Sequence, residues 1–138
     1  MPTITMRLPA RTNEELRSFF DLQGLGPSEG VRRIVEEFWV TKMFEHIEFR
    51  DVPNGRRAAL CNGPEIWEII SYRRDYGGDE EGFKAHFGWI SPAALDAAVE
   101  YYNRYPDDVD KLIIENDRYE RFLSERLGSE GDVSIPVR

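Results

Sequence analysis

The feature that most constrains this chain is a short alternating segment at its beginning. From Thr3 to Leu8 polar and apolar residues alternate, and Pro9 follows directly. A period of two is typical of a strand with one buried face. The apolar members are Ile4, Met6 and Leu8, and the polar members are Thr3, Thr5 and Arg7. So short a strand is not stable alone, and the simplest partner is the same strand of a second copy.

Two helices are expected after this strand. Thr12 and Glu15 have the spacing of a capping box, which predicts that the first helix begins at Thr12. Gly24 and Gly26 end that helix, and Ser28 is expected to cap a second one that reaches about residue 44. The second helix carries apolar residues at helical spacing, namely Val31, Ile34, Val35, Phe38 and Trp39.

A ribbon of two paired strands has the width of the major groove of B-DNA. Arg7 would point outward from both chains, where arginine can donate hydrogen bonds to guanine O6 and N7. Thr3 and Thr5 offer a hydroxyl and a methyl group on the same face. The first backbone N–H groups of the second helix, at Ser28 and Glu29, can hold a phosphate. These five residues are the predicted DNA contacts.

The order of strand, capped helix, glycine turn and the stretch Gly26-Pro27-Ser28-Glu29-Gly30-Val31-Arg32-Arg33-Ile34-Val35 resembles the ribbon-helix-helix family of repressors and antitoxins. The resemblance covers about 40 residues. It implies an obligate homodimer and strand residues that read bases, and it leaves open whether dimers join into a higher oligomer. The dimer core that it implies consists of Ile4, Met6, Leu8, Ile34 and Phe38.

The sequence predicts a second, mainly helical domain over residues 45–127 and a tail over residues 128–138. Residues 48–52 and 57–60 read as two short strands joined by the turn Pro53-Asn54-Gly55. Helices are expected after Gly63-Pro64, after Asp79, after Ser91 and from Pro106. With residues 1–44 as the first domain, the fold class is mainly α.

Several stretches of the second domain resemble the family catalogued as domain of unknown function 433. They are Arg57-Ala58-Ala59-Leu60, Trp67-Glu68-Ile69-Ile70, Ala98-Val99-Glu100-Tyr101-Tyr102 and Tyr105-Pro106-Asp107-Asp108-Val109-Asp110. The resemblance covers residues 48–115 and implies a helix-turn-helix-like fold. It also implies an antitoxin of the VapB-like kind, whose partner is a PIN-like ribonuclease toxin. The turn Cys61-Asn62-Gly63-Pro64 departs from the Gly-Thr-Arg turn that this family often has.

Charge separates the two domains. Residues 1–44 carry six basic and six acidic residues, whereas the other 94 residues carry 12 basic and 20 acidic ones and so supply the whole net charge of −8. The helix-turn-helix-like domain places Asp96 and Glu100 beside Arg104 on its candidate recognition helix, and phosphate repels such a helix. An acidic, aromatic-rich surface suits a basic protein partner better.

No catalytic, metal or cofactor site is readable, so we do not expect an enzyme. The acidic residues Asp107 and Asp108 fall in a first helical turn, where carboxylates favour the helix dipole. Cys61 is expected to be buried as a small apolar residue. Tyr102 is expected in the core, with Tyr101 and Tyr105 exposed. No apolar run reaches the about 20 residues that cross a bilayer, and no signal peptide is visible, which favours the cytoplasm.

The function predicted from the sequence is the antitoxin of a type II toxin-antitoxin system, which binds its own operator DNA as a dimer and neutralises the toxin. Two other interpretations remain open. A stand-alone ribbon-helix-helix repressor would bind DNA without a toxin partner. A protein-interaction module would show no salt-dependent DNA binding. An enzyme is the least favoured interpretation.

Overall fold

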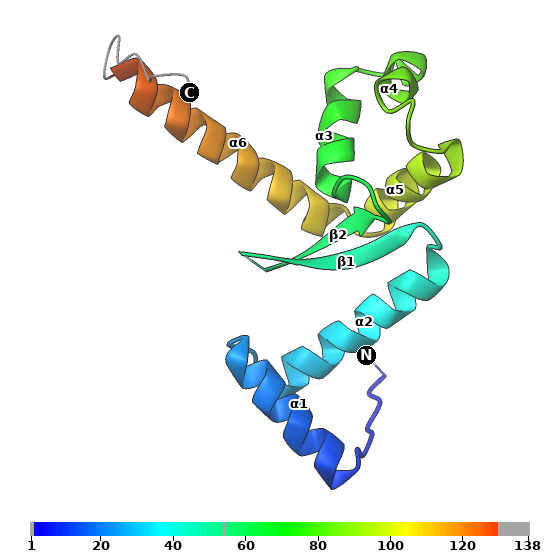
Figure 1. Cartoon of the computed structure of the whole chain (residues 1–138), viewed down its shortest axis with the longest axis vertical. Coiled ribbons are helices and arrows are strands. Elements are labelled where there is room, and N and C mark those ends of the chain that lie inside the picture. The colour runs from blue at the N-terminus through cyan, green and yellow to red at the C-terminus, as the bar shows by residue number, and fades with distance from the viewer. Residues whose placement is uncertain (1, 54, 130–138) are drawn as a thin grey trace. The chain divides into compact units, whose positions relative to one another are not determined.

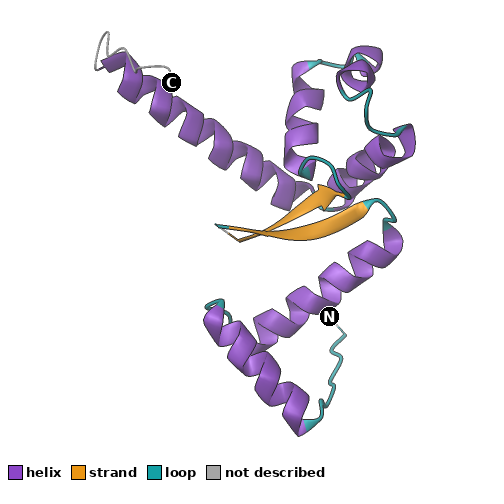
Figure 2. Cartoon of the chain, viewed as in Figure 1, coloured by secondary structure: helices purple, strands orange, loops and turns teal. Residues whose placement is uncertain are grey.

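The computed structural model describes residues 2–53 and 55–129 of the chain. In this range the protein is mainly helical with one small antiparallel sheet, as the sequence predicts (Figure 2). The chain divides into two compact units, Met1–Met43 and Phe44–Arg138. The division lies one residue from the domain boundary expected after residue 44. We call these parts the N-terminal unit and the C-terminal unit.

The N-terminal unit consists of two helices joined by a tight turn. Helix α1 spans Ala10–Leu22 and helix α2 spans Pro27–Met43 (Figure 1). Gly24 has φ of 71° at the end of α1. The Leu25 N–H donates to the Phe20 carbonyl at 2.9 Å, and the Gly24 N–H donates to the Asp21 carbonyl at 3.1 Å. This pair of bonds is a Schellman motif, so Gly24 ends the helix as predicted.

Both helices begin earlier than the sequence suggests. The N-cap of α1 is Pro9, whose carbonyl accepts the Asn13 N–H at 2.9 Å. The predicted capping box is therefore wrong: Thr12 lies inside the first turn, since Ala10 and Arg11 are better helix formers than threonine. Helix α2 begins at Pro27, a residue suited to the first helical position. Ser28 is thus the second residue of α2, and not its cap.

The N-terminal segment, residues 2–9, has no regular secondary structure in the single chain. The strand expected at Thr3–Leu8 is therefore not formed here. A strand exists only through hydrogen bonds to a neighbouring strand, and the expected neighbour belongs to a second copy. Pairing between two copies stays a prediction.

Close packing of α1 on α2 depends on Gly30. The Phe20 ring lies against this glycine, and a Cβ atom at position 30 would stand 2.5 Å from the ring carbons. Phe20 is correspondingly buried. Glycine disfavours a helix, and the sequence alone does not explain its presence at position 30. The structure does, because any side chain at position 30 would push the Phe20 ring away.

The C-terminal unit is built on a β-hairpin. Strand β1 spans Ile47–Val52 and strand β2 spans Gly55–Leu60. They pair antiparallel in a register that runs from Ile47 opposite Leu60 to Val52 opposite Gly55. The hairpin predicted from the sequence is confirmed. Its inner residues pack on α3 and α5, because β2 contacts α3 and β1 contacts α5.

Four helices complete the C-terminal unit. They are α3 (Ile66–Asp75), α4 (Glu80–His86), α5 (Pro92–Arg104) and α6 (Pro106–Ser129). The predicted caps are confirmed, since Asp79 accepts the Gly82 N–H at 3.0 Å and Ser91 accepts the Ala94 N–H at 3.2 Å. The core lies around α3, which contacts β2, α4, α5 and α6. Its largest fully buried side chains are Phe83, Leu60, Ile66, Ile69 and Ile70.

Three expectations about single residues are wrong. Tyr101 is buried, with its ring centroid 6.0 Å from that of Phe44, whereas Tyr102 is only partly buried. The alanines at 94, 97 and 98 share a face with Tyr101 and leave room for its ring. Cys61 is exposed, and not buried. It lies in the turn that follows the buried Leu60 at the end of β2.

Helix α6 is longer than the rest of the unit needs. Its first half buries Val109 and Ile113, which fits the predicted fourth helix. Its second half continues to Ser129 and extends away from α3, α4 and α5 (Figure 1). The predicted tail therefore begins inside a helix, and its residues 130–138 lie outside the described residues.

Candidate nucleic-acid interface

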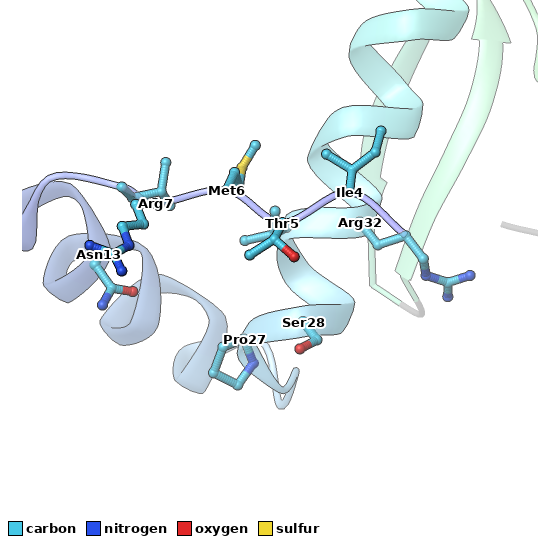
Figure 3. Close-up of a pocket in the computed structure, with 10 residues that line it drawn as sticks. Ile4, Thr5, Met6, Arg7, Asn13, Pro27, Ser28 and Arg32 are labelled. Atoms are coloured by element: carbon cyan, nitrogen blue, oxygen red, sulfur yellow. The ribbon is translucent and has the colours of Figure 1, made fainter. Parts of the chain in front are cut away.

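The predicted DNA-binding residues meet at an open groove of the N-terminal unit. The groove has a volume of about 670 Å³ and lies between the N-terminal segment and the first turns of α1 and α2 (Figure 3). Its lining combines the alternating segment with the start of α2: Ile4, Thr5, Met6, Arg7, Leu8, Asn13, Pro27, Ser28, Val31 and Arg32. Three of the five predicted contacts, Thr5, Arg7 and Ser28, line it. Thr3 and Glu29 do not.

Side chains of the N-terminal segment alternate in direction. Figure 3 shows Thr5 and Arg7 on one side of the backbone and Ile4 and Met6 on the other. This is the arrangement that the sequence predicts for a strand with one apolar and one polar face. The segment therefore holds its side chains as a strand would, although it has no partner to bond with.

Arg7 differs from the other arginines near the groove. No described residue forms an ion pair with Arg7, whereas Arg11 pairs with Glu15 at 3.1 Å. Arg32 donates to both carboxylate oxygens of Glu29, at 2.6 and 2.7 Å. The Arg7 guanidinium thus keeps its donors for a ligand. Its five N–H groups form the rigid fork that matches a guanine edge or a phosphate.

The start of α2 presents backbone donors at the groove. Gly26 accepts the Gly30 N–H at 2.9 Å, which is the first hydrogen bond of the helix. Pro27 has no N–H, so the helix leaves Ser28 and Glu29 as its unbonded donors. The Glu29 carboxylate would repel a phosphate there, but its pairing with Arg32 offsets that charge.

The N-terminal unit buries few of its large apolar side chains in the single chain; Phe20 and Val40 are the buried ones among its described residues. All five residues of the predicted dimer core are exposed, with Ile4 at 90% and Phe38 at 61% relative exposure. Other large apolar side chains of α1 and α2 are exposed with them, namely Phe19, Leu22, Val35, Trp39 and Met43. So much apolar surface on a unit of this size marks an interaction site. Units this small seldom stay folded without further support.

The C-terminal unit contains two polar clusters that sequence reasoning missed. Arg50 donates to the carbonyls of Gly63 at 2.7 Å and Leu60 at 2.8 Å, and to Glu48 at 2.8 Å. Glu48 also accepts the Asn62 N–H at 3.1 Å. The Arg50 hydrogen bond and the Asn62 N–H hold the pKa of Glu48 below its ordinary value. These bonds fix the turn that departs from the Gly-Thr-Arg pattern. The Glu-x-Arg spacing on one strand face was the available signal.

The second cluster joins α3, α5 and α6. Asp110 accepts hydrogen bonds from the Tyr102 hydroxyl at 2.9 Å and from Arg74, which also donates to the Tyr102 oxygen at 2.7 Å. The Tyr102 hydroxyl and the Arg74 guanidinium lower the pKa of Asp110. Arg74 and Asp110 are 36 residues apart, and no sequence pattern could have paired them. Asp110 of α6 is thus hydrogen-bonded to both α3 and α5.

An aromatic surface lies at the junction of α3 and α4. The His86 ring stacks on Tyr72 with centroids 4.5 Å apart, and its Nδ1 lies 3.3 Å from the Tyr76 hydroxyl. Trp89 is 68% exposed beside Phe87. We call Tyr72, Tyr76, His86 and Trp89 the aromatic surface. Exposed tryptophan and tyrosine are typical of protein-binding hot spots.

Within the described residues, no group of three or more His, Cys, Asp or Glu side chains is placed to hold a metal ion. None of the described helices combines the length and apolar character of a membrane span. Comparison with known proteins gives no match to a family model, a curated protein or a solved structure.

Proposed function

We propose that this protein is a homodimeric DNA-binding regulator of the ribbon-helix-helix kind. The proposal is carried by the directions of the side chains in the N-terminal segment. Its Ile4 and Met6 are exposed on one side, and its Thr5 and Arg7 point to the other. Pairing with the same segment of a second copy satisfies the strand hydrogen bonds and covers the apolar side. The same step presents two copies of Arg7 on a ribbon that fits the major groove.

The contacts divide by role. Arg7, Thr5 and Thr3 read base edges, while the N–H groups of Ser28 and Glu29 hold a phosphate and fix the register. The net charge of residues 1–44 is zero, so binding depends on these few placed donors and on the dimer that doubles them. The salt dependence should accordingly be shallow, because few phosphates are neutralised.

The experiment is binding to the DNA upstream of the protein's own gene, at several salt concentrations. Arg7→Ala should weaken specific binding by about 1–3 kcal/mol. Arg17→Ala is the matched control, because Arg17 is an exposed arginine of α1 that donates to Asn13 and lies outside the groove. Equal affinities of the Arg7→Ala and Arg17→Ala variants would rule out Arg7 as a base reader. No specific binding by the parent would leave the protein-interaction module.

We further propose that the C-terminal unit makes this regulator an antitoxin, acting in the cytoplasm on a PIN-like ribonuclease toxin. The resemblance of residues 48–115 to domain of unknown function 433 supports this. The acidic excess of that half and the aromatic surface support it too, because a ribonuclease must carry a basic surface for RNA. Here the aromatic side chains give contact area and the carboxylates give complementary charge.

This second step is tested with the product of the neighbouring gene. The purified protein should bind that product and inhibit its ribonuclease activity, and Trp89→Ala should weaken the complex. Lys84→Ala, at an exposed position of α4, is the control. If the neighbouring product neither binds nor is inhibited while DNA binding persists, the stand-alone repressor is the correct assignment.

A further inference from the structure

The second half of α6 presents an apolar stripe that the described residues leave exposed, with the Arg126 guanidinium 5.9 Å from the centre of the Phe122 ring. Residues 116–129, which we call the free half of α6, extend past the helices that cover the first half (Figure 1). Tyr119 is 61% exposed and Phe122 is 55% exposed, and Leu123 and Leu127 are exposed with them. A helix that ended near residue 116 would complete the core of the unit equally well.

The stripe lies beside the face by which α6 joins the core. Val109 and Ile113 are buried on that face. Counting on from Val109 by 3.6 residues per turn reaches Asn116, Glu120, Leu123 and Leu127, and Tyr119 and Phe122 lie on one side of that row. The free half therefore has an apolar side suited to helix packing, but it extends past the other helices of its own unit. Repeats of three and four residues are those by which two helices pack along their length.

The charges of the free half fit a second copy of the same segment. Residues 116–129 carry three acidic residues, Asp117, Glu120 and Glu125, and three basic ones, Arg118, Arg121 and Arg126. The segment is neutral within a half of the chain that is otherwise strongly acidic. Two copies of the free half do not repel each other, whereas most other surfaces of the C-terminal unit would.

One pair of these charges also sets a direction. Arg118 and Glu125 lie two turns apart, on the same edge of the stripe, and at equal distances from its middle near Phe122. In an antiparallel pair, Arg118 of one copy faces Glu125 of the other, and the reverse holds at the other end. In a parallel pair, Arg118 of one copy and Glu125 of the other would lie on opposite sides of the interface and could not pair.

We propose that the free half of α6 pairs with the free half of a second copy as an antiparallel helix pair centred near Phe122. Tyr119 then packs against Leu123 of the other copy, and the two Phe122 rings meet at the centre. This interface is separate from the ribbon of the N-terminal unit. With both, each chain has two self-association surfaces, so ribbon dimers can join into larger assemblies and bind neighbouring DNA sites together.

The test is sedimentation equilibrium of the full chain and of two disrupted variants. Met6→Asp places a charge in the ribbon core, and Leu123→Asp places one in the stripe. Met6→Asp should retain a species of twice the 16.1 kDa chain mass, and the double variant Met6→Asp/Leu123→Asp should be monomeric. Ser124→Asp in the Met6→Asp background is the control, since this exposed residue lies outside the stripe. Circular dichroism checks that each variant keeps its helices.

A monomeric Met6→Asp variant at all concentrations would overturn the proposal and leave the stripe to a different protein. Dimers that persist in the double variant would overturn it as well. Failure of the ribbon is distinguishable, because Leu123→Asp alone would then be monomeric. The antiparallel direction has its own test in the Met6→Asp background. Arg118→Glu and Glu125→Arg should each shift the dimer towards monomer, and the two together should restore it. No restoration would contradict the antiparallel pairing.

Discussion

The two units of this chain bury their apolar residues in different ways. In the C-terminal unit the hairpin and helices cover each other, so that Ile69 and Phe83 are almost fully buried within one chain. In the N-terminal unit Ile4, Met6 and Phe38 stay exposed in the same chain. The C-terminal unit buries its core apolar residues within one chain, whereas the N-terminal unit leaves many of its own exposed. The difference is what the proposed homodimer requires, because pairing of two copies would cover the apolar residues of the N-terminal unit.

The largest expected effect comes from the core of the C-terminal unit. Phe83→Ala removes a ring that is 1% exposed and should lower the free energy of unfolding by about 3–5 kcal/mol. Chemical unfolding followed by circular dichroism measures the change. The loss should be the same at low and high protein concentration, because this core belongs to one chain. A loss of stability that disappears at high protein concentration would show that this core depends on a second chain.

A smaller effect is expected from the contact between α1 and α2. Gly30→Val forces a side chain into the Phe20 ring and should cost about 1–3 kcal/mol through overpacking. If the proposed dimer stabilises the N-terminal unit, the variant dimer should also dissociate at a higher protein concentration than the parent. Glu36→Val, at an exposed position of the same helix, is the control and should change little. Equal behaviour of the two variants would show that α1 does not pack on Gly30.

The smallest effect concerns the cluster of Arg74, Tyr102 and Asp110. Tyr102→Phe removes the hydroxyl that donates to Asp110 and should cost about 0.5–1.5 kcal/mol. Because the pKa of Asp110 is lowered in the folded protein, its contribution to stability is complete above the unfolded pKa of about 3.9. That contribution is lost as the pH falls through the folded pKa.

The Tyr102→Phe penalty should therefore be present at neutral pH and shrink in acid below the pKa of a free aspartate. Unfolding curves of the parent and the variant over this range measure it. Phe122→Ala, which changes an exposed ring outside the cluster, should show no such pH dependence. A Tyr102→Phe penalty that grows in acid would contradict the lowered pKa of Asp110.

Local signals predicted most of the C-terminal unit. Proline and glycine mark its turns, and the caps at Asp79 and Ser91 lie where short-range chemistry places them. The errors at Tyr101 and Tyr102 concern two neighbouring residues of α5, either of which could point into the core. The sequence cannot tell whether Tyr101 or Tyr102 points into the core, because neighbouring elements decide it. The pairing of Arg74 with Asp110 is likewise a product of the fold.

The residues of the candidate interface were predicted only in part. Period-two alternation correctly places Thr5 and Arg7 opposite Ile4 and Met6, because backbone geometry alone sets that pattern. The start of α1 was misplaced, because Pro9 caps it where Thr12 was expected. Strand pairing depends on a second chain, so neither the sequence nor a single copy can display it.

Hydrogen exchange of the N-terminal segment tests directly whether residues 3–8 pair between two copies of the chain. The amides of residues 3–8 should be protected in the parent, with protection that increases with protein concentration, because strand bonds form only between two copies. Met6→Asp should abolish that protection and leave the amides of α3 protected as before. Unprotected exchange of residues 3–8 at every protein concentration would contradict the shared ribbon and therefore the proposed binding of that ribbon to DNA.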